Sequence, residues 1–339
     1  MIRVGINGFG RIGRAFFRAA MEDSDIEVVA INDLGDLSNL AYLLKYDTVY
    51  GTLKEHIAAE NGQLVAGDKR VHVTQEKDPT KLPWGSLNID IVVESTGVFD
   101  DYEKASAHLT AGAKRVVISA PVKGDSEHGA LVLVGLNEDK LANCQISSNA
   151  SCTTNAGSPI IAILDEKLGI EKAVLNTVHA YTATQSIVDS PAKGSDMRRG
   201  RAGAQNITPS STGAAIAVTK AYKELEGKFD GIAMRVPVVA GSIVDITFIA
   251  KRETSTDEVN QMLEESAREE RWNGVYGVTR EQLVSSDIVD MHASSLVDLN
   301  LTRVVGGNLV KVMAWYDNEM GYVQTLMRHI KSAAKHINK

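Results

Sequence analysis

The chain has 339 residues, with 43 acidic and 36 basic side chains, so its formal net charge is −7. Hydrophobic residues make up 44% of the chain and charged residues 23%, a composition that excludes a disordered protein. At roughly 150 residues per domain, this length predicts two domains. The acidic balance argues against nucleic acid as the primary partner, because phosphate backbones bind basic faces.

The ends and the cysteines of the chain predict a cytoplasmic protein that does not enter a membrane. No basic region followed by an apolar stretch opens the sequence, so we expect no signal peptide. Apolar runs such as 130–134 are far shorter than the roughly 20 residues of a membrane-spanning helix. Cys144 and Cys152 are too few for a disulfide framework or a four-cysteine zinc site, and we expect no metal.

Short apolar segments alternate with helical patterns over the first 150 residues. The predicted strands are 2–7, 26–32, 71–74, 89–94, 115–119, 130–134 and 145–148. The predicted helices are 11–22, 37–44 and 102–111. Apolar strands separated by helices are typical of a parallel sheet that is covered on both faces.

The pattern changes after residue 150. A helix at 153–168 precedes strands at 173–181, 231–236, 242–251 and 308–316, with helices at 213–224 and 256–268. The irregular segment 182–209 is too long for an ordinary connection, and such loops are often functional. The final segment, 319–338, is predicted to be an amphipathic helix that docks its apolar stripe. We therefore predict an α/β fold: a parallel-sheet domain and an α+β domain with a mixed sheet.

Three glycines follow the first predicted strand and open the first predicted helix. Gly8, Gly10 and Gly13 match the spacing that permits a tight turn, close approach to a pyrophosphate, and helix packing on the strand. Asp33 follows at the end of the second strand, 20 residues after Gly13, where a carboxylate can bind ribose hydroxyls. The alternative is a glycine-rich turn with no ligand. Because a carboxylate repels a 2′-phosphate, the pattern favours NAD over NADP.

Cys152 lies in a polar cluster, 148–155, that joins a strand to a helix. At the helix N-terminus, the dipole is expected to lower the pKa of a thiol and to favour a nucleophilic thiolate. The alternative is a buried, inert cysteine, which Cys144 fits better. We therefore predict that Cys152 is a nucleophile.

His179 is the candidate base for Cys152. It lies late in a predicted strand, beside the irregular segment, although a histidine in an apolar strand is more often structural. Arginines at 198–201 and Arg235 are candidates for binding a phosphorylated substrate in an otherwise acidic protein. A solvated charge cluster or a subunit contact is the alternative for 198–201.

With these residues in place, the chain resembles the phosphorylating glyceraldehyde-3-phosphate dehydrogenase family over essentially its whole length. The resemblance rests on eight segments: 5–14, 31–34, 94–99, 150–155, 178–182, 209–215, 234–237 and 315–322. It implies a Rossmann-type NAD-binding domain over 1–151, with the C-terminal helix 318–339 docked on it, and a catalytic domain over 152–317. The loop 182–209 would line a neighbour's cofactor pocket in a homotetramer.

The resemblance also implies a reaction and its residues. Glyceraldehyde 3-phosphate would be oxidised by NAD and phosphorylated to 1,3-bisphosphoglycerate through a hemithioacetal and a thioester of Cys152, with His179 as the base. The cofactor residues would be Gly8, Gly10, Arg11, Ile12, Gly13, Asp33, Thr96, Ser119, Asn318 and Tyr322. Thr182 and Arg235 would bind the substrate phosphate. The inorganic phosphate would be bound by Ser151, Thr153, Thr212 and Gly213, with Arg199 between the two anions.

Three alternatives remain open from the sequence. An erythrose-4-phosphate dehydrogenase would share the fold and the pairing of Cys152 with His179. A non-enzymatic dinucleotide-binding regulator would not need that pair. A metal-dependent hydrolase has no support, because no His-Glu-x-x-His or Cys-x-x-Cys spacing occurs. The sequence also leaves open whether Arg198 or Arg199 lies between the anions, and in which direction the reaction runs.

Overall fold

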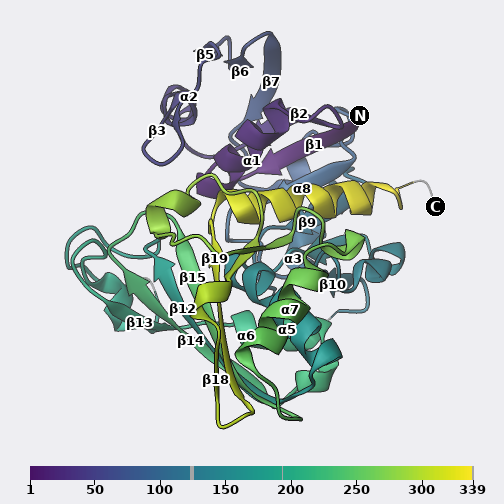
Figure 1. Cartoon of the computed structure of the whole chain (residues 1–339). Helices are drawn as coiled ribbons and strands as arrows, with labels where there is room; N and C mark the ends of the chain where they lie inside the picture. The colour runs from purple at the N-terminus through teal and green to yellow at the C-terminus, as the bar shows by residue number, and fades with distance from the viewer. Residues whose placement is uncertain (123–125, 193, 338–339) are drawn as a thin grey trace. The chain divides into compact units, whose positions relative to one another are not determined.

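The computed structural model describes residues 1–122, 126–192 and 194–337. The chain forms two compact units (Figure 1). The first unit comprises Met1–Val132, Asn137–Ala150 and Leu326–Lys339, and the second comprises Leu133–Leu136 and Ser151–Thr325. Among the residues that the structure describes, no helix combines the length and the apolar character needed to cross a bilayer.

The first unit is built on a nine-stranded sheet with the order β10-β11-β9-β8-β1-β2-β7-β6-β5. Its strands are β1 Ile2–Asn7, β2 Ile26–Asn32, β5 Ile57–Glu60, β6 Gln63–Ala66, β7 Lys69–Thr74, β8 Ile91–Glu94, β9 Arg115–Ile118, β10 Gly129–Leu131 and β11 Ile146–Ser148. All neighbours from β10 to β7 are parallel. Every residue of β8 and β9 is buried, as expected where helices cover both faces. The predicted parallel sheet is confirmed.

An antiparallel extension, β5-β6-β7, completes this sheet. β7 overlaps the predicted strand 71–74, but β5 and β6 were absent from the sequence prediction. Asn61 and Gly62 connect β5 to β6 with φ angles of 51° and 75°. Two positive φ angles are what a type I′ hairpin turn requires, and Asn-Gly is its commonest sequence. The turn signal was therefore present, although the flanking strands are only four residues long. A further pair, β3 Tyr46–Asp47 and β4 Gly51–Thr52, forms its own small ladder.

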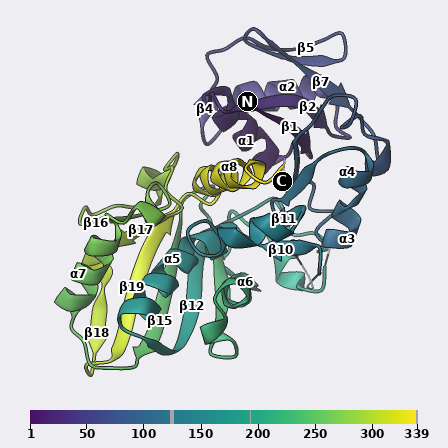
Figure 2. The same cartoon turned by 90° about the vertical axis from the view of Figure 1, so that its right-hand side faces the viewer.

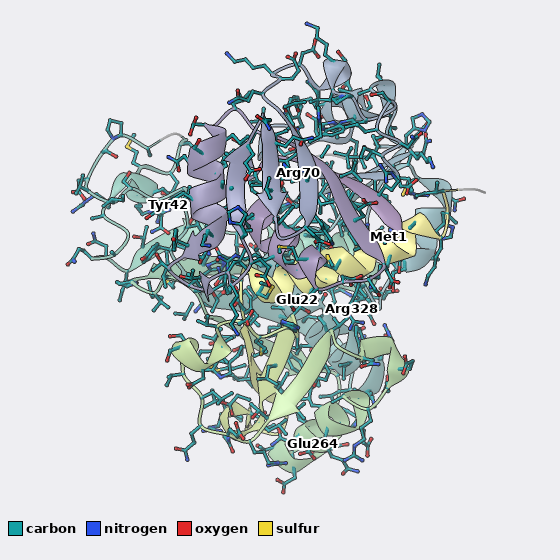
Figure 3. The ribbon with its side chains drawn as sticks, turned by 90° about the horizontal axis from the view of Figure 1, so that it is seen from above. Met1, Glu22, Tyr42, Arg70, Glu264 and Arg328 are labelled. Carbon is teal, nitrogen blue, oxygen red and sulfur yellow. The ribbon has the colours of Figure 1, made fainter. Side chains whose placement is uncertain are left out.

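The helices of the first unit are α1 Arg11–Met21, α2 Leu37–Lys45, α3 Tyr102–Ala105 and α4 Ala107–Thr110 (Figure 2). The single helix predicted at 102–111 is wrong, because it divides at Ser106. The hydroxyl of Ser106 donates to the carbonyl of Glu103, and this local bond competes with a continuous helix. Polar side chains such as Glu22 and Arg70 are exposed on the outer surface of the unit (Figure 3).

The second unit contains a mixed sheet with the order β13-β14-β12-β15-β19-β17-β16, and β18 pairs with β19. Its strands are β12 Ile170–Ala180, β13 Thr208–Ser211, β14 Phe229–Val236, β15 Ser242–Ala250, β16 Tyr276–Thr279, β17 Ser295–Asp298, β18 Arg303–Val305 and β19 Leu309–Tyr316. The pairs β12–β14 and β16–β17 are parallel, and the other pairs are antiparallel. The predicted mixed sheet is confirmed, but the short strands β13, β16, β17 and β18 were not predicted.

The core of the second unit lies between this sheet and the helices α5 Cys152–Lys167, α6 Ala214–Ala221 and α7 Thr256–Ser266. Along β19, Val310, Val312 and Ala314 are buried, whereas the residues between them are partly exposed. This alternation follows from the two-residue period of a strand, and it gives the sheet one buried face. The opposite face leaves Val174 59% and Ile232 49% exposed.

The last helix, α8 Met320–Ala334, begins after Asp317, whose carboxylate accepts the backbone N–H groups of Glu319 and Met320. The division between the two units falls inside α8, after Thr325. In the first unit, Lys331 of α8 pairs with Asp23 and Asp25 at 2.7 and 2.9 Å. The predicted helix ended at Asn338, which lies outside the described residues.

Candidate functional site

The glycine turn of the first unit follows β1 and opens α1. Gly8 has a φ of +97°, and a Cβ there would lie 2.7 Å from the carbonyl carbon of Ser95. A Cβ at Gly13 would lie 2.2 Å from the carbonyl oxygen of Gly8, so the helix packs directly on the turn. A Cβ at Gly10 would meet nothing within 4 Å, so the backbone is open on that side. An open backbone before a helix N-terminus fits a pyrophosphate.

Asp33 stands at the end of β2, beside this turn. Its two carboxylate oxygens accept the backbone N–H groups of Phe9 at 2.6 Å and Gly35 at 2.8 Å. A carboxylate has about four lone-pair sites, so these two bonds leave acceptor capacity for ribose hydroxyls. The turn therefore holds Asp33 in place through Phe9.

The other predicted cofactor residues of the first unit surround the same strand ends. Thr96 follows β8 and Ser119 follows β9, both at the carboxyl edge of the parallel strands, where ligands bind in such sheets. Arg11 and Ile12 form the first turn of α1. The guanidinium of Arg11 forms an ion pair with Asp47, which fixes its direction.

Cys152 is the first residue of α5, and its sulfur lies 3.4 Å from Nε2 of His179 on β12. Ser151 caps the helix, because its hydroxyl accepts the N–H of Thr154 at 3.1 Å. The preceding Ala150 has a φ of +54°, a left-handed conformation that disfavours any residue with a Cβ. Such strain is typical of a backbone that must present a reactive group.

Burial controls the protonation of this pair. It raises the pKa of the Cys152 thiol and outweighs the lowering by Arg235 and by the hydrogen bonds of Thr153. It also lowers the pKa of His179 to about 3, with a further lowering by the charge of Arg235. The expectation of a lowered pKa for Cys152 is therefore wrong for this structure, since removal from water outweighs the helix terminus. Both groups are therefore neutral in this structure, so Nε2 of His179 is not already protonated as an imidazolium.

Two groups compete for Nδ1 of His179. The carbonyl oxygen of Ala180 lies 2.7 Å from Nδ1, and Nη1 of Arg235 lies 2.6 Å from it. A carbonyl only accepts, whereas a guanidinium only donates. With the proton on Nδ1, the lone pair of Nε2 faces Cys152 and can act as a base. With Arg235 donating to Nδ1, the proton resides on Nε2 and is donated toward sulfur.

The arginines of the loop take different directions. Nε and Nη2 of Arg199 reach the hydroxyl of Ser210 at 3.1 and 2.7 Å, and its Nη1 lies 3.3 Å from the hydroxyl of Thr184. Arg198 pairs with Asp196 at 2.9 Å and is exposed, whereas Arg199 reaches the same carboxylate only at 4.0 Å. Thr182 shares a hydrogen bond of 2.8 Å with Thr184. The hydroxyl of Thr184 thus links Arg199 to Thr182.

The residues predicted to bind inorganic phosphate differ in whether their hydroxyl or their backbone is available to an anion. The hydroxyl of Thr153 is buried and shares a hydrogen bond of 2.9 Å with Tyr316, so only its backbone is suited to an external anion. The hydroxyl of Thr212 accepts the N–H of Ala214 at 3.2 Å. Gly213 is the N-cap of α6, and a Cβ there would meet nothing within 4 Å.

Ser242 connects the predicted residue Asn318 to Ala180, the neighbour of His179 in the chain, and sequence reasoning missed it. Its hydroxyl accepts the N–H of Ala180 at 3.1 Å and donates to Oδ1 of Asn318 at 2.9 Å. This bridge places the amide of Asn318 at the end of β12 that carries His179. Tyr322, four residues further on, is buried in α8.

Tyr316 was also missed, although it lies in a segment that carries the resemblance. Its hydroxyl bonds Thr153 and Thr177, and its ring meets that of His179 edge-on at 5.9 Å. No periodicity in the sequence distinguishes it from an ordinary core tyrosine. Within the described residues, no group of three or more His, Cys, Asp or Glu side chains could hold a metal ion.

Comparisons with known proteins agree with this geometry. The family model "Glyceraldehyde 3-phosphate dehydrogenase, NAD binding domain" matches residues 2–102, and "Glyceraldehyde 3-phosphate dehydrogenase, C-terminal domain" matches residues 151–318. The resemblance inferred from the sequence and the assignment of NAD as cofactor are confirmed.

Curated relatives match over nearly the whole chain. Glyceraldehyde-3-phosphate dehydrogenase of Streptomyces coelicolor is 47% identical over 329 residues, 96% of each chain. Glyceraldehyde-3-phosphate dehydrogenase 1 of Bacillus subtilis is 48% identical over 323 residues, 95% of each chain. Glyceraldehyde-3-phosphate dehydrogenase of Clostridium pasteurianum is 45% identical over 338 residues, 99% of each chain. The chain therefore belongs to the glyceraldehyde-3-phosphate dehydrogenase family.

Proposed function

We propose that the chain oxidises glyceraldehyde 3-phosphate with NAD and phosphorylates it to 1,3-bisphosphoglycerate. The observation that carries the proposal is the 3.4 Å distance between Sγ of Cys152 and Nε2 of His179 in a chain with an NAD-binding domain. A thiol next to a neutral imidazole is the arrangement that covalent aldehyde oxidation requires. The relatives reported above carry the name of this activity, and none of them is named for erythrose 4-phosphate.

The first step forms a bond between Cys152 and the aldehyde carbon. Sγ attacks the carbonyl, and the thiol proton passes to Nε2 of His179. Protonated His179 then returns this proton to the former carbonyl oxygen, which gives a hemithioacetal and leaves Nε2 able to act as a base again. This addition creates the hydroxyl-bearing carbon that the oxidation requires, since an aldehyde has none.

The second step oxidises the hemithioacetal to a thioester. Bound NAD supplies the acceptor for the hydride that leaves the substrate carbon. His179 removes the hydroxyl proton as the hydride departs, so that the hemithioacetal loses two electrons and two protons in all. The N–H at Cys152, in the first turn of α5, is suited to stabilise negative charge on the substrate oxygen.

The third step transfers the acyl group to inorganic phosphate. A phosphate oxygen attacks the thioester carbon, the C–S bond breaks, and the Cys152 thiolate leaves. Protonated His179 returns its proton to the sulfur, which restores the resting pair. The product is an acyl phosphate that retains the energy of the oxidation.

Arg235 links substrate binding to the protonation of His179. We assign Arg235 and Thr182 to the phosphate of the substrate, and an anion there would draw the guanidinium away from Nδ1. The carbonyl of Ala180, 2.7 Å away, would then be the partner of Nδ1. That tautomer leaves the lone pair of Nε2 facing Cys152, so substrate binding would select the basic form.

The second anion site is assigned to Ser151, Thr153, Thr212 and Gly213, with Arg199 between the two anions. Gly213 precedes the N-terminus of α6, and Cys152 and Thr153 begin α5, so both helix ends offer backbone N–H groups. Among the cofactor residues, Asn318 would hold the carboxamide of NAD and Tyr322 would lie beside its ring. Residues 1–151 and 318–339 would form the cofactor domain, and 152–317 the catalytic domain.

We further propose that the enzyme is a cytoplasmic homotetramer. Large apolar side chains are exposed in the loop 182–209: Ile187 is 90%, Met197 84% and Val188 70% accessible. The outward face of the second sheet adds Val174 and Ile232. Exposed apolar groups on one loop and one sheet face are typical of protein interfaces. Light scattering of the purified protein tests this, because a monomer at assay concentration would contradict it.

A spectrophotometric assay of NADH formation tests the reaction. We expect turnover with glyceraldehyde 3-phosphate and NAD. Without inorganic phosphate, we expect only one equivalent of NADH per active site, because the thioester is not released. Faster turnover with erythrose 4-phosphate would assign the chain to that aldehyde instead. NAD binding without turnover on either aldehyde would favour a regulatory role.

A further inference from the structure

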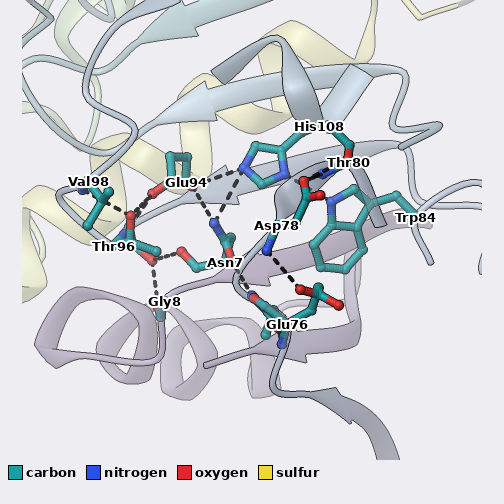
Figure 4. A network of polar contacts seen from close by, with 12 residues as sticks. Asn7, Gly8, Glu76, Asp78, Thr80, Trp84, Glu94, Thr96, Val98 and His108 are labelled. Carbon is teal, nitrogen blue, oxygen red and sulfur yellow. Dashed lines mark hydrogen bonds and ion pairs between the residues drawn. The ribbon is translucent and has the colours of Figure 1, made fainter. Parts of the chain in front are cut away.

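A buried polar network lies behind the glycine turn of the first unit (Figure 4). His108 of α4 is fully buried, and Glu94 at the end of β8 is 2% exposed. Nε1 of Trp84 donates to Nδ1 of His108 at 3.0 Å, and Nε2 of His108 lies 3.0 Å from Oε2 of Glu94. Asn7, at the end of β1, donates from Nδ2 to the same oxygen at 2.6 Å. None of these four residues belongs to the catalytic pair.

Trp84 fixes the tautomer of His108. An indole N–H can only donate, so Nδ1 of His108 must be an acceptor without a proton. A neutral imidazole then carries its proton on Nε2, which faces Glu94. The approach of Asn7 Nδ2 to His108 Nε2, at 3.4 Å, joins two donors in this tautomer and is not a hydrogen bond. His108 is therefore a donor to Glu94 and has no alternative partner in this arrangement.

Glu94 accepts four hydrogen bonds on two oxygens. Oε2 accepts from Asn7 and His108, and Oε1 accepts from the backbone N–H of Thr96 at 2.8 Å and from its hydroxyl at 2.5 Å. A carboxylate satisfies four donors, whereas an amide of the same shape would turn an NH₂ group toward two of them. Buried networks of this kind stabilise one geometry only when every member is satisfied.

The network joins the ends of four parallel strands. Oδ1 of Asn7, on β1, accepts from Nδ2 of Asn32, on β2, at 2.8 Å. Oδ1 of Asn32 in turn accepts the hydroxyl of Thr74, on β7, at 2.8 Å. Asp33 follows Asn32 directly, and Gly8 follows Asn7. The carboxylate of Glu94 is thus the point where the ends of β1 and β8 meet, with β2 one hydrogen bond further and β7 two hydrogen bonds further.

The strand ends joined in this way also hold the glycine turn. The hydroxyl of Ser95, next to Glu94, donates to the carbonyl of Gly8 at 2.7 Å. The hydroxyl of Thr96 accepts the N–H of Val98 at 3.0 Å, which shapes the loop after β8. A shift of Glu94 would therefore move both the loop at Thr96 and the turn at Gly8.

We propose that Glu94 is a positioning residue for NAD, oriented by the Trp84–His108 pair, which holds the glycine turn and the loop after β8 in their binding geometry. The inference rests on NAD binding by this unit and not on the catalytic steps proposed above. Glu94 belongs to the first unit, and the Cys152–His179 pair belongs to the second, so we expect the effect of Glu94 to fall on cofactor affinity.

Glu94→Gln tests the proposal with almost no change of volume. We expect the Kd for NAD, measured by calorimetry, to rise at least tenfold, and the KM for NAD to rise in parallel. We expect kcat at saturating NAD to change less than threefold. Asp101→Asn is the matched control, because Asp101 caps α3 through the N–H of Lys104 and does not touch Glu94. A Kd within twofold of the wild type for Glu94→Gln would overturn the proposal, whatever the change in melting temperature.

The wild-type protein offers a second test that needs no variant. Long-range ¹H–¹⁵N correlation spectra distinguish the two imidazole tautomers, and we expect His108 to carry its proton on Nε2. A proton on Nδ1 would overturn the proposed orientation by Trp84. His108→Gln and His108→Leu extend this test, because a Gln amide can still donate to Glu94 and a Leu cannot. We expect NAD to bind at least threefold more tightly to the Gln variant, and equal affinities would contradict the role of His108.

Discussion

Two buried histidines, one in each unit, differ in how their Nδ1 atoms are satisfied. Nδ1 of His108 meets one donor, the indole of Trp84, so a single tautomer is selected. Nδ1 of His179 meets both an acceptor, the carbonyl of Ala180, and a donor, Arg235. Either tautomer of His179 is therefore available without a change of fold. Burial alone therefore does not decide whether a histidine is structural or reactive, because the hydrogen-bond partners that compete for Nδ1 also decide it.

The largest expected effect comes from removing the reactive partner of His179. Cys152→Ser replaces the thiol with a hydroxyl, whose higher pKa makes it a far weaker nucleophile beside the same imidazole. We expect dehydrogenase activity to fall by roughly 10⁴-fold or more. NAD affinity, measured by calorimetry, should stay within about twofold of the wild type, since the cofactor turn belongs to the other unit. Turnover above one per cent of the wild-type rate would refute the assignment of Cys152 as nucleophile.

His179→Asn tests the base itself. Asn keeps a polar group near Nδ1 but has no atom that can take the proton from the Cys152 sulfur. We expect acylation, followed as the burst of NADH in a single turnover, to slow by about 10²–10⁴-fold. A loss below tenfold would show that the proton leaves by another route. The corresponding change at His108 should leave the burst rate almost unchanged at saturating NAD.

Arg235→Gln removes one of the two partners that compete for Nδ1 of His179. Because the Arg235 charge lowers the pKa of His179 in addition to burial, the variant should have a higher His179 pKa. The base is active only when neutral, so activity is lost as the pH falls through this pKa. The acid limb of the acylation rate should therefore move to higher pH.

The same variant should also lose substrate affinity. A charge-assisted hydrogen bond contributes about 1.5–3 kcal/mol, which corresponds to roughly a 10–150-fold loss of kcat/KM for the phosphorylated aldehyde. Glyceraldehyde without its phosphate is the control substrate, and it should be affected far less. An equal loss for both aldehydes would place Arg235 outside the phosphate site.

Much of this arrangement follows from the sequence, and its limits have physical causes. The spacing of Gly8, Gly10 and Gly13 predicts the turn, because the glycine requirements there are steric and local. The pairing of Cys152 with His179 was proposed from helix-end chemistry and the family resemblance, but the distance depends on tertiary structure. The direction of the Cys152 pKa was missed, because the burial of a group is not encoded in its neighbours along the chain.

Networks of buried polar side chains are the part of the structure that is hardest to predict from the sequence. Glu94 and His108 are 14 residues apart, and Trp84 is 24 residues from His108, so no local pattern connects them. Ser242 and Asn318 are joined across 76 residues in the same way. The sequence predicts strands and their carboxyl ends, but not which polar side chains meet behind them. His108 lies inside the predicted helix 102–111, and no neighbour along the chain indicates that it is completely buried.

The smallest expected effect is a change in cofactor selectivity at Asp33, in the unit that also contains His108. Asp33 is next to Asn32 of the network, and its carboxylate is held by the N–H groups of Phe9 and Gly35 at 2.6 and 2.8 Å. Asp33→Ala removes the acceptor for the ribose hydroxyls and the charge that repels a 2′-phosphate. We expect kcat/KM for NAD to fall several-fold and that for NADP to rise, so that their ratio changes by about tenfold or more. Steady-state kinetics with both cofactors measure this ratio, and an unchanged ratio would show that Asp33 does not face the ribose. Glu94→Gln should instead weaken both cofactors equally, since it moves the turn without altering the charge beside the ribose.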